Sequence, residues 1–210
     1  MHLTPRGARR RAGLLDAALR IMVREGSGSV TLRSVVMEAK ASHGSVAYYF
    51  QSRKMLIREA LRFVAQQNVQ ALSKSWQEID RQGNDVKAIA ALIARHSNHQ
   101  MIEDRRMGIV IHQLHLAAAR DPDLRPILRA WGRAYARITR ETLIAIGSPD
   151  PAADAALLTN AINGMVIGQL ALPRKDFESE VLRPTLERLL IGIQQRAVAS
   201  NGKSSRKSRR

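Results

Sequence analysis

The segment from Thr31 to Phe50 constrains the fold more than any other part of the chain. Thr31 and Ser42 are residue types that favour helix N-caps, and apolar residues recur at helical spacing after each of them. The sequence therefore predicts two short helices joined by a tight turn, a helix-turn-helix arrangement whose second helix can enter the DNA major groove. A plain helical hairpin fits the apolar pattern equally well, so the flanking sequence has to decide between the two.

The sequence on both sides of this motif also predicts helices. Thr4 and Pro5 form an N-cap followed by proline at the first helical position, and Gly26 is a suitable C-terminal stop. Downstream, Ser52 is a suitable cap for a further long helix. We therefore expect a three-helix domain with a fourth helix leading out of it.

Several separated elements of this region share their order and spacing with a known family. They are Leu14 to Ala18, Gly26, Thr31 to Ala39, Ser42 to Val46, Tyr49 to Arg53, and Leu56. On these residues the chain resembles the tetracycline-repressor (TetR) family of bacterial regulators. The resemblance implies an all-helical body that holds an inducer pocket and whose last two long helices pair with those of a second protomer.

Two residues depart from the family's usual pattern. Lys40 stands at the turn position that is usually glycine, so it must either adopt a strained φ or shift the turn. Ala47 stands where an aromatic residue is common, and it can offer only a methyl group to DNA. Both departures affect the expected operator sequence more than the expected fold.

The charge of the chain is large and unevenly distributed. The formal net charge is +16, with 12 Lys or Arg against 4 acids in residues 1–62, and 5 basic residues and no acid in residues 198–210. A basic domain and a basic tail around a nearly balanced body are typical of a polyanion binder. An anionic membrane would also attract the chain, but no segment combines a Lys/Arg-rich polar face with bulky aromatic anchors. Double-stranded DNA is therefore the expected partner.

The predicted recognition helix supplies two groups of DNA-binding residues. Small and polar side chains at its N-terminal end can reach base edges, and hydroxyl or basic side chains around it can hold phosphates. By the resemblance, Arg53 stands where a phosphate-contacting lysine is usual. The base-edge candidates are Ser42, His43, Gly44 and Ser45, and the phosphate candidates are Thr31, Arg33, Tyr48, Tyr49, Arg53 and Lys54.

The composition and the helix signals predict an all-α protein in three parts. These are a helix-turn-helix domain over residues 1–51, a helical ligand-binding and dimerisation domain over residues 52–199, and a basic disordered tail over residues 200–210. The chain has no cysteine, no signal-like start and no apolar run long enough to span a membrane. We expect a soluble cytoplasmic protein without a membrane partner.

The last two predicted helices of the body carry apolar faces that suit a homodimer, which a two-fold operator requires. A buried internal packing face would explain the same residues equally well. The proposed interface residues are Leu158, Ile162, Met165, Val166, Gln169, Leu186, Leu189, Leu190 and Ile193.

The middle of the body mixes adaptable apolar side chains with a few polar ones, which is the composition of ligand cavities. Each such residue could also be ordinary core. The candidates for binding a small-molecule inducer are Met101, Met107, Ile111, His112, His115, Trp131, Tyr135, Asn160 and Asn163.

Other classes of function find less support in the sequence. His96 with His99, and His112 with His115, are i, i+3 pairs that could hold Zn²⁺ or Ni²⁺, but scattered surface or pocket histidines are the better interpretation. We predict no metal, no cofactor and no enzymatic activity, because no nucleophile–base set or phosphate-binding glycine loop is present. The preferred function is a dimeric repressor released from a palindromic operator by an inducer, and the alternative is a nucleoid-type DNA-binding protein without one.

Overall fold

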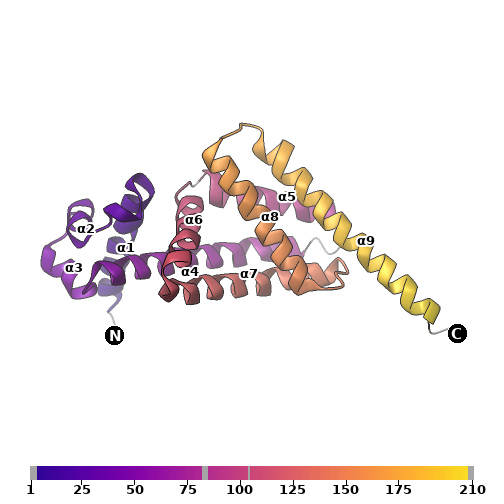
Figure 1. The fold of residues 1–210 in the computed structure, drawn as a ribbon, viewed down its shortest axis with the longest axis horizontal. Helices are drawn as coiled ribbons and strands as arrows, with labels where there is room; N and C mark the ends of the chain where they lie inside the picture. Colours follow the sequence, from indigo (N-terminus) through magenta and orange to yellow (C-terminus); the bar gives the residue numbers. More distant parts are fainter. Residues whose placement is uncertain (1–3, 82–84, 104, 208–210) are drawn as a thin grey trace. The chain divides into compact units, whose positions relative to one another are not determined.

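The computed structural model describes residues 4–81, 85–103 and 105–207, and leaves aside the side chains of residues 75, 78–80 and 197–207. The described chain is 87% helical and has no strand, which confirms the all-α prediction (Figure 1). Over the same residues, no helix is both long and apolar enough to cross a membrane. The α-helices are α1 (Pro5–Glu25), α2 (Leu32–Glu38), α3 (His43–Tyr49), α4 (Arg53–Asp80), α5 (Val86–Asn98), α6 (Arg105–Arg120), α7 (Arg125–Ala145), α8 (Pro151–Ala171) and α9 (Arg183–Lys207).

The chain forms two compact units. The first comprises Met1–Gln67 and Ile109–Arg129, and the second comprises Asn68–Gly108 and Ala130–Arg210, so α4, α6 and α7 each contribute to both. This division is based on which residues pack together. The ranges 1–51 and 52–199 are predicted from the expected functions of the two parts, and they stay a prediction.

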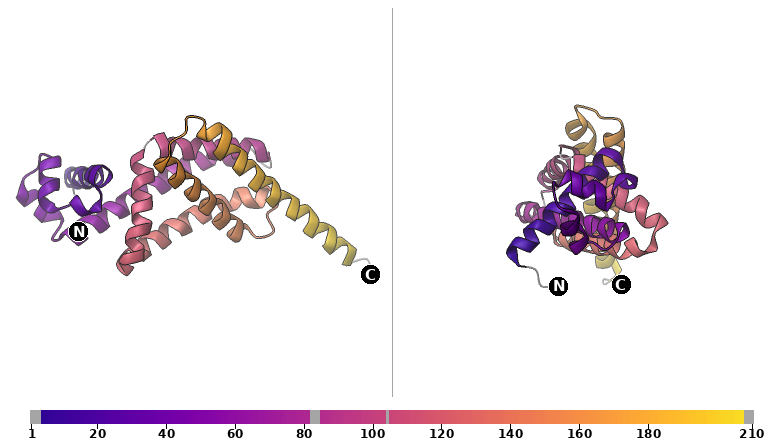
Figure 2. Two further views of the ribbon diagram at one scale, coloured as in Figure 1. Left: turned by 45° about the horizontal axis from the view of Figure 1, so that its top comes forward. Right: turned by 90° about the vertical axis from the view of Figure 1, so that its left-hand side faces the viewer.

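The first unit contains the predicted helix-turn-helix. Thr31 and Ser42 both act as N-caps, and the turn between α2 and α3 contains Lys40 with a φ of 48°. The turn therefore keeps its position and places a non-glycine residue in the left-handed region. Val35, Val46 and Phe50 are fully buried, so α2 and α3 share one core. The short helices of this unit lie close together at the N-terminal end of the ribbon (Figure 2).

The second unit has its core between α5, α8, α9 and the second half of α4. Buried side chains at this core include Leu72, Ile89, Leu182, Leu186 and Leu190. Asp85 and Asp150 cap α5 and α8, and Pro151 occupies the first turn of α8. Each cap lies within one turn of the N–H groups that it satisfies, so local sequence sets both helix starts.

The residues predicted for the dimer interface belong to the core of a single chain. Val166, Leu186, Leu190 and Ile193 are at most 1% exposed, and Gln169 is bonded to the backbone of Arg174. These side chains pack inside a single protomer, and the pairing of α8 and α9 with a second copy stays a prediction. Leu158 is also buried, and Ile162, Met165 and Leu189 are half-buried against the same core.

α9 continues to Lys207, so its helical backbone enters the segment 200–210. The basic disordered tail that the sequence indicates there stays a prediction. Extending an existing helix avoids the cost of nucleating a new one, which explains how a Ser/Lys/Arg-rich segment can continue it. Residues 208–210 lie outside the described residues.

Candidate DNA-binding surface and ligand pocket

The recognition helix α3 presents the surface that the sequence predicts. Ser42, His43, Gly44 and Tyr48 are exposed, and Tyr48 retains 67% of its accessible area. Tyr49 is half-buried, and its ring meets that of Tyr48 edge to face at 5.0 Å between centroids. The exposed end of α3 therefore combines small, hydrogen-bonding and aromatic groups.

Arg10 of α1 is a neighbour of the recognition helix that the residue-by-residue prediction missed. Its Nε donates a 2.8 Å hydrogen bond to Oγ of Ser45. The only sequence signal for it is the run Arg9–Arg11, a positive cluster in the first half of α1. Because the side chain is exposed, it adds a positive charge directly beside a candidate base-reading hydroxyl.

Arg53 and Lys54, both predicted to hold phosphates, have protein partners. Arg53 donates from Nε to the carbonyl of Val30 (2.8 Å) and from an Nη to those of Ser27 (2.8 Å) and Gly28 (3.2 Å). Lys54 Nζ lies 2.7 Å from Asp123 and 3.4 Å from Asp121, and these carboxylates raise the pKa of Lys54. Both side chains therefore hold the first unit together.

The remaining phosphate candidates on α2 differ in their hydrogen bonds and exposure. Thr31 caps α2 by accepting from the backbone N–H of Ser34, while Arg33 is exposed on the first turn of the same helix. Nearby, Arg20 and Arg24 bind the Glu38 carboxylate, and their hydrogen bonds lower its pKa, Arg20 contributing most. The acid on α2 is thus neutralised by partners from α1.

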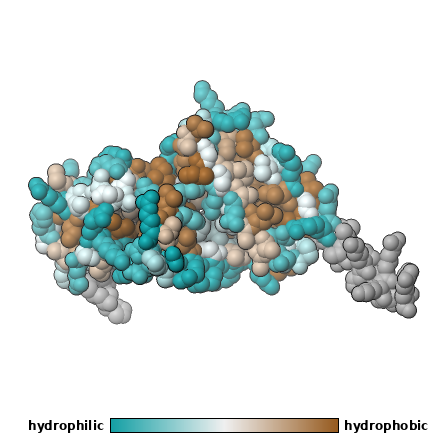
Figure 3. Space-filling view, viewed as in Figure 1, coloured by the Kyte–Doolittle hydropathy of each residue, from teal (hydrophilic) through white to brown (hydrophobic). Residues whose placement is uncertain are grey.

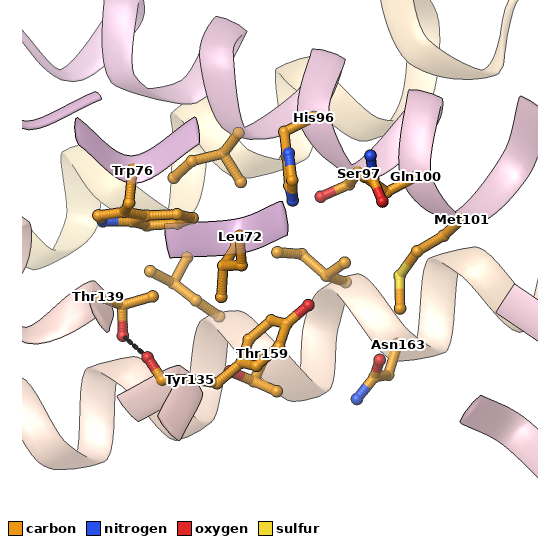
Figure 4. Close-up of a pocket in the computed structure, with 13 residues that line it drawn as sticks. Leu72, Trp76, His96, Ser97, Gln100, Met101, Tyr135, Thr139, Thr159 and Asn163 are labelled. Carbon is orange, nitrogen blue, oxygen red and sulfur yellow. Dashed lines mark hydrogen bonds between the residues drawn. The ribbon is translucent and has the colours of Figure 1, made fainter. Parts of the chain in front are cut away.

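The second unit contains an open pocket (Figure 4), and the empty space among its lining atoms, counted together with the solvent at its mouth, is about 520 Å³. Residues from α4, α5, α7 and α8 surround it. The lining residues are Leu72, Trp76, Ile93, His96, Ser97, Gln100, Met101, Tyr135, Thr139, Leu158, Thr159, Ile162 and Asn163.

Three of the predicted ligand-binding residues, Met101, Tyr135 and Asn163, line this cavity, and Leu158 and Ile162 line it although we had assigned them to the dimer interface. The other candidates lie elsewhere. Buried core holds Met107, Ile111 and Trp131, whereas His112 and His115 are half-buried on α6 and Asn160 is exposed on α8. The sequence missed His96 and Trp76 as lining residues, because only the packing of four helices brings them together.

Burial controls the ionisation of the two titratable groups at the cavity. Desolvation, assisted by the nearby His99, lowers the pKa of His96 to about 4, so its imidazole is neutral at pH 7. Burial raises the pKa of Tyr135, whose hydroxyl donates to Oδ1 of Asn68 over 2.6 Å. Trp131 Nε1 donates to the same oxygen over 2.9 Å.

The histidine pairs have ordinary protein partners. His99 Nδ1 lies 2.9 Å from the Glu103 carboxylate, and His115 Nδ1 lies 2.8 Å from the carbonyl of Ile111. In the described part of the chain, no three His, Cys, Asp or Glu side chains are grouped as a metal site requires.

An apolar face of α8 is exposed on the second unit. Leu157 and Ile167 retain 43% and 47% of their accessible area, and Leu172, which follows the helix, retains 79%. The small residues Gly164 and Gly168 are exposed between them. Figure 3 shows hydrophobic surface in the region where Figure 1 draws α8.

Comparison with known proteins finds transcriptional regulators among the relatives of this chain. A curated relative, the HTH-type nicotine-responsive transcriptional repressor HdnoR of Paenarthrobacter nicotinovorans, is 29% identical over 136 residues, which are 65% of this chain and 68% of that protein. A transcriptional regulator from Rhodococcus sp. Rha1 shares the fold with a TM-score of 0.75 at 23% identity, covering 89% of this chain and 97% of the other. The multidrug binding protein EbrR, solved with ethidium, gives a TM-score of 0.65 at 26% identity, covering 86% and 97% of the two chains.

Family models account for most of the sequence. One described as "Bacterial regulatory proteins, tetR family" matches residues 14–60, which include the helix-turn-helix. One described as "Tetracyclin repressor-like, C-terminal domain" matches residues 84–192, which include most of the cavity lining. The chain therefore belongs to the tetracycline-repressor family of transcriptional regulators.

Proposed function

We propose that this regulator is a homodimeric repressor that leaves a palindromic operator when a small molecule binds the cavity between α4, α5, α7 and α8. The main support for the proposal is that one helix, α4, both follows the helix-turn-helix and lines the cavity. This helix begins next to the recognition helix, at Arg53, and carries Leu72 and Trp76 of the cavity lining further along. A ligand that displaces these two side chains acts on the same helix that follows the DNA-binding helices in the sequence.

The names of the relatives support a small-molecule signal. HdnoR is a nicotine-responsive repressor, and EbrR is a multidrug binding protein that accommodates ethidium. Release requires that the ligand prefer the conformation with low DNA affinity, because a ligand that binds both states equally shifts nothing.

On DNA, we expect α3 to lie in the major groove with Ser42, His43, Gly44 and Ser45 at base edges. Tyr48, Arg33 and Arg10 are exposed near them and suit phosphate contacts. Arg53 acts mainly by donating hydrogen bonds to the carbonyls of Ser27, Gly28 and Val30, and Lys54 by pairing with Asp121 and Asp123. The ring of Tyr49 packs against that of Tyr48.

The test of DNA recognition is selection of bound genomic fragments followed by footprinting at about physiological salt. A protected palindrome is the expected result. Arg33→Gln should then weaken binding and reduce the magnitude of the salt-dependence slope by about 1, as expected for one lost phosphate contact. Uniform, salt-labile coating without a footprint would contradict operator recognition and favour the nucleoid-type alternative.

We propose that the exposed face of α8 contributes to the dimer surface. Two symmetry-related copies could bury Leu157 and Ile167 against each other, and Gly164 and Gly168 permit close approach of the helices. Leu157→Glu with Ile167→Glu should convert the protein to monomers in light scattering. Ile144→Glu on α7, a side chain also 43% exposed, is the matched control and should leave the dimer intact.

A further inference from the structure

The cavity is lined by side chains that carry no charge at neutral pH. Its described lining contains no Asp, Glu, Lys or Arg, and its single histidine is neutral because burial depresses its pKa. An ion moved from water into such a site loses its hydration without gaining a counter-charge. The lining therefore supplies no counter-charge to a cationic or an anionic ligand.

Two aromatic residues present their rings, and not their polar groups, to a ligand. Trp76 Nε1 already donates to Oγ1 of Thr142 over 2.8 Å, and the Tyr135 hydroxyl already donates to Asn68. Figure 4 shows both rings beside the same space, with the thioether of Met101 at its other end. Rings and a thioether provide flat, polarisable surface, which suits an aromatic ligand.

His96 offers such a ligand a buried polar atom that has no partner within the described part of the protein. Its ring enters the space from α5, on the side opposite Tyr135 (Figure 4). Its Nε2 is buried and has no hydrogen-bond partner among the described residues. A neutral imidazole carries one donor and one acceptor nitrogen, and a hydroxyl group can pair with either tautomer because it both donates and accepts.

We propose that the cavity binds an uncharged aromatic molecule that carries a hydroxyl group, with the hydroxyl at Nε2 of His96 and the aromatic ring between Trp76 and Tyr135. This inference rests on the proposed function, since it names the class of ligand for the same cavity.

The test uses four bicyclic probes that differ little in shape: 2-naphthol, naphthalene, 2-naphthoate and N-methylquinolinium. Binding to the protein of residues 1–210 is measured at pH 7 by calorimetry and by quenching of tryptophan fluorescence. We expect 2-naphthol to bind about 2- to 10-fold more tightly than naphthalene, the value of one net hydrogen bond. The two ions should bind weaker than naphthalene by a factor on the order of 100 or more.

Two variants test whether His96 is the side chain that makes 2-naphthol bind more tightly than naphthalene. His96→Phe keeps a ring of similar size but removes both nitrogens, so 2-naphthol and naphthalene should bind it equally. His99→Phe is the matched control, because His99 is an exposed neighbour paired with Glu103, and it should retain the wild-type order. The order of the four probes on the wild-type protein tests the ligand class even if His96→Phe does not fold.

The outcomes separate the ligand class from the proposed function. Tighter binding of N-methylquinolinium or 2-naphthoate than of 2-naphthol, or no binding of any probe up to its solubility limit, would overturn the ligand class. If the probes bind in the expected order but 2-naphthol leaves the affinity for the footprinted DNA unchanged, the ligand class stands and the inducer role is refuted.

Discussion

Replacing Gly108 on α6 by alanine should lower the stability of the protein. The same replacement at an uncrowded helical glycine should raise it. A Cβ built there would approach the carbonyl oxygen of Met101 far inside the normal contact distance and would lie 3.0 Å from Cδ1 of Leu170. The oxygen belongs to the backbone of a π-helical turn, η2 (His99–Glu103), so it cannot rotate away as a side chain could. Gly108→Ala therefore requires α6 and this turn to separate.

The expected magnitude follows from two opposing effects. Overpacking of a tight contact costs about 1–3 kcal/mol, while replacing helical glycine by alanine returns up to about 1 kcal/mol. Gly132 on α7 provides the control, because a Cβ there meets nothing within 4 Å. Gly132→Ala should gain up to about 1 kcal/mol, and Gly108→Ala should lose about 1–2 kcal/mol.

Thermal unfolding followed by calorimetry measures both variants. For a chain of this size, 1 kcal/mol corresponds to a Tm shift of about 2–4 °C, so the two variants should differ by roughly 2–12 °C. Because Met101 lines the cavity, Gly108→Ala should also weaken 2-naphthol binding, whereas Gly132→Ala should not. Equal Tm values for the two variants would refute the close approach of α6 to Met101.

Three further predictions concern the turn, the first unit and pH. Lys40→Gly should raise stability by about 0.5–1 kcal/mol because it relieves a left-handed φ, whereas Lys40→Ala, which removes the same charge, should give no gain in Tm. Arg53→Lys should lower the free energy of unfolding, measured with denaturant, by about 1–2 kcal/mol, because an ammonium cannot reproduce the hydrogen bonds to the carbonyls of Ser27, Gly28 and Val30. Unchanged stability would contradict this structural role of Arg53. The pKa of His96 in the folded protein, about 4, lies below its ordinary value of 6.5. The stability that the neutral His96 contributes to the folded state is therefore fully present above pH 6.5 and is lost as the pH falls toward 4. Unfolding at pH 7.5 and pH 5 should show this loss in the wild type and in His99→Phe but not in His96→Phe.

Features that depend on neighbouring residues were predictable from the sequence. Thr4, Thr31 and Ser42 all cap the helices expected of them, because a cap and the N–H groups it satisfies lie within one turn. The strained φ of Lys40 was also foreseeable, since the alternatives at that position were only strain or a shifted turn. The family follows from the same residues and is confirmed by the family models.

Features that depend on distant residues were not predictable in the same way. Both faces of α8 are apolar, so its periodicity does not reveal whether Leu158 or Leu157 points outward; the structure buries Leu158 and exposes Leu157. Similarly, Lys54 finds its partner in Asp123, far along the chain, and a sequence read locally leaves that lysine available for DNA. His96 becomes a cavity residue only through the packing of four helices.

The uncharged lining of the cavity has a consequence for how this protein could acquire a new signal. Asn163 and Asp have nearly the same shape, and a single base change in the codon exchanges them. Asn163→Asp would place one buried carboxylate among Met101, Tyr135 and the other lining groups, and a carboxylate there would favour a cation over the neutral molecule of the same outline. Selectivity for ligand charge can thus change within an otherwise constant cavity, while the helix-turn-helix and the operator it reads remain as they were.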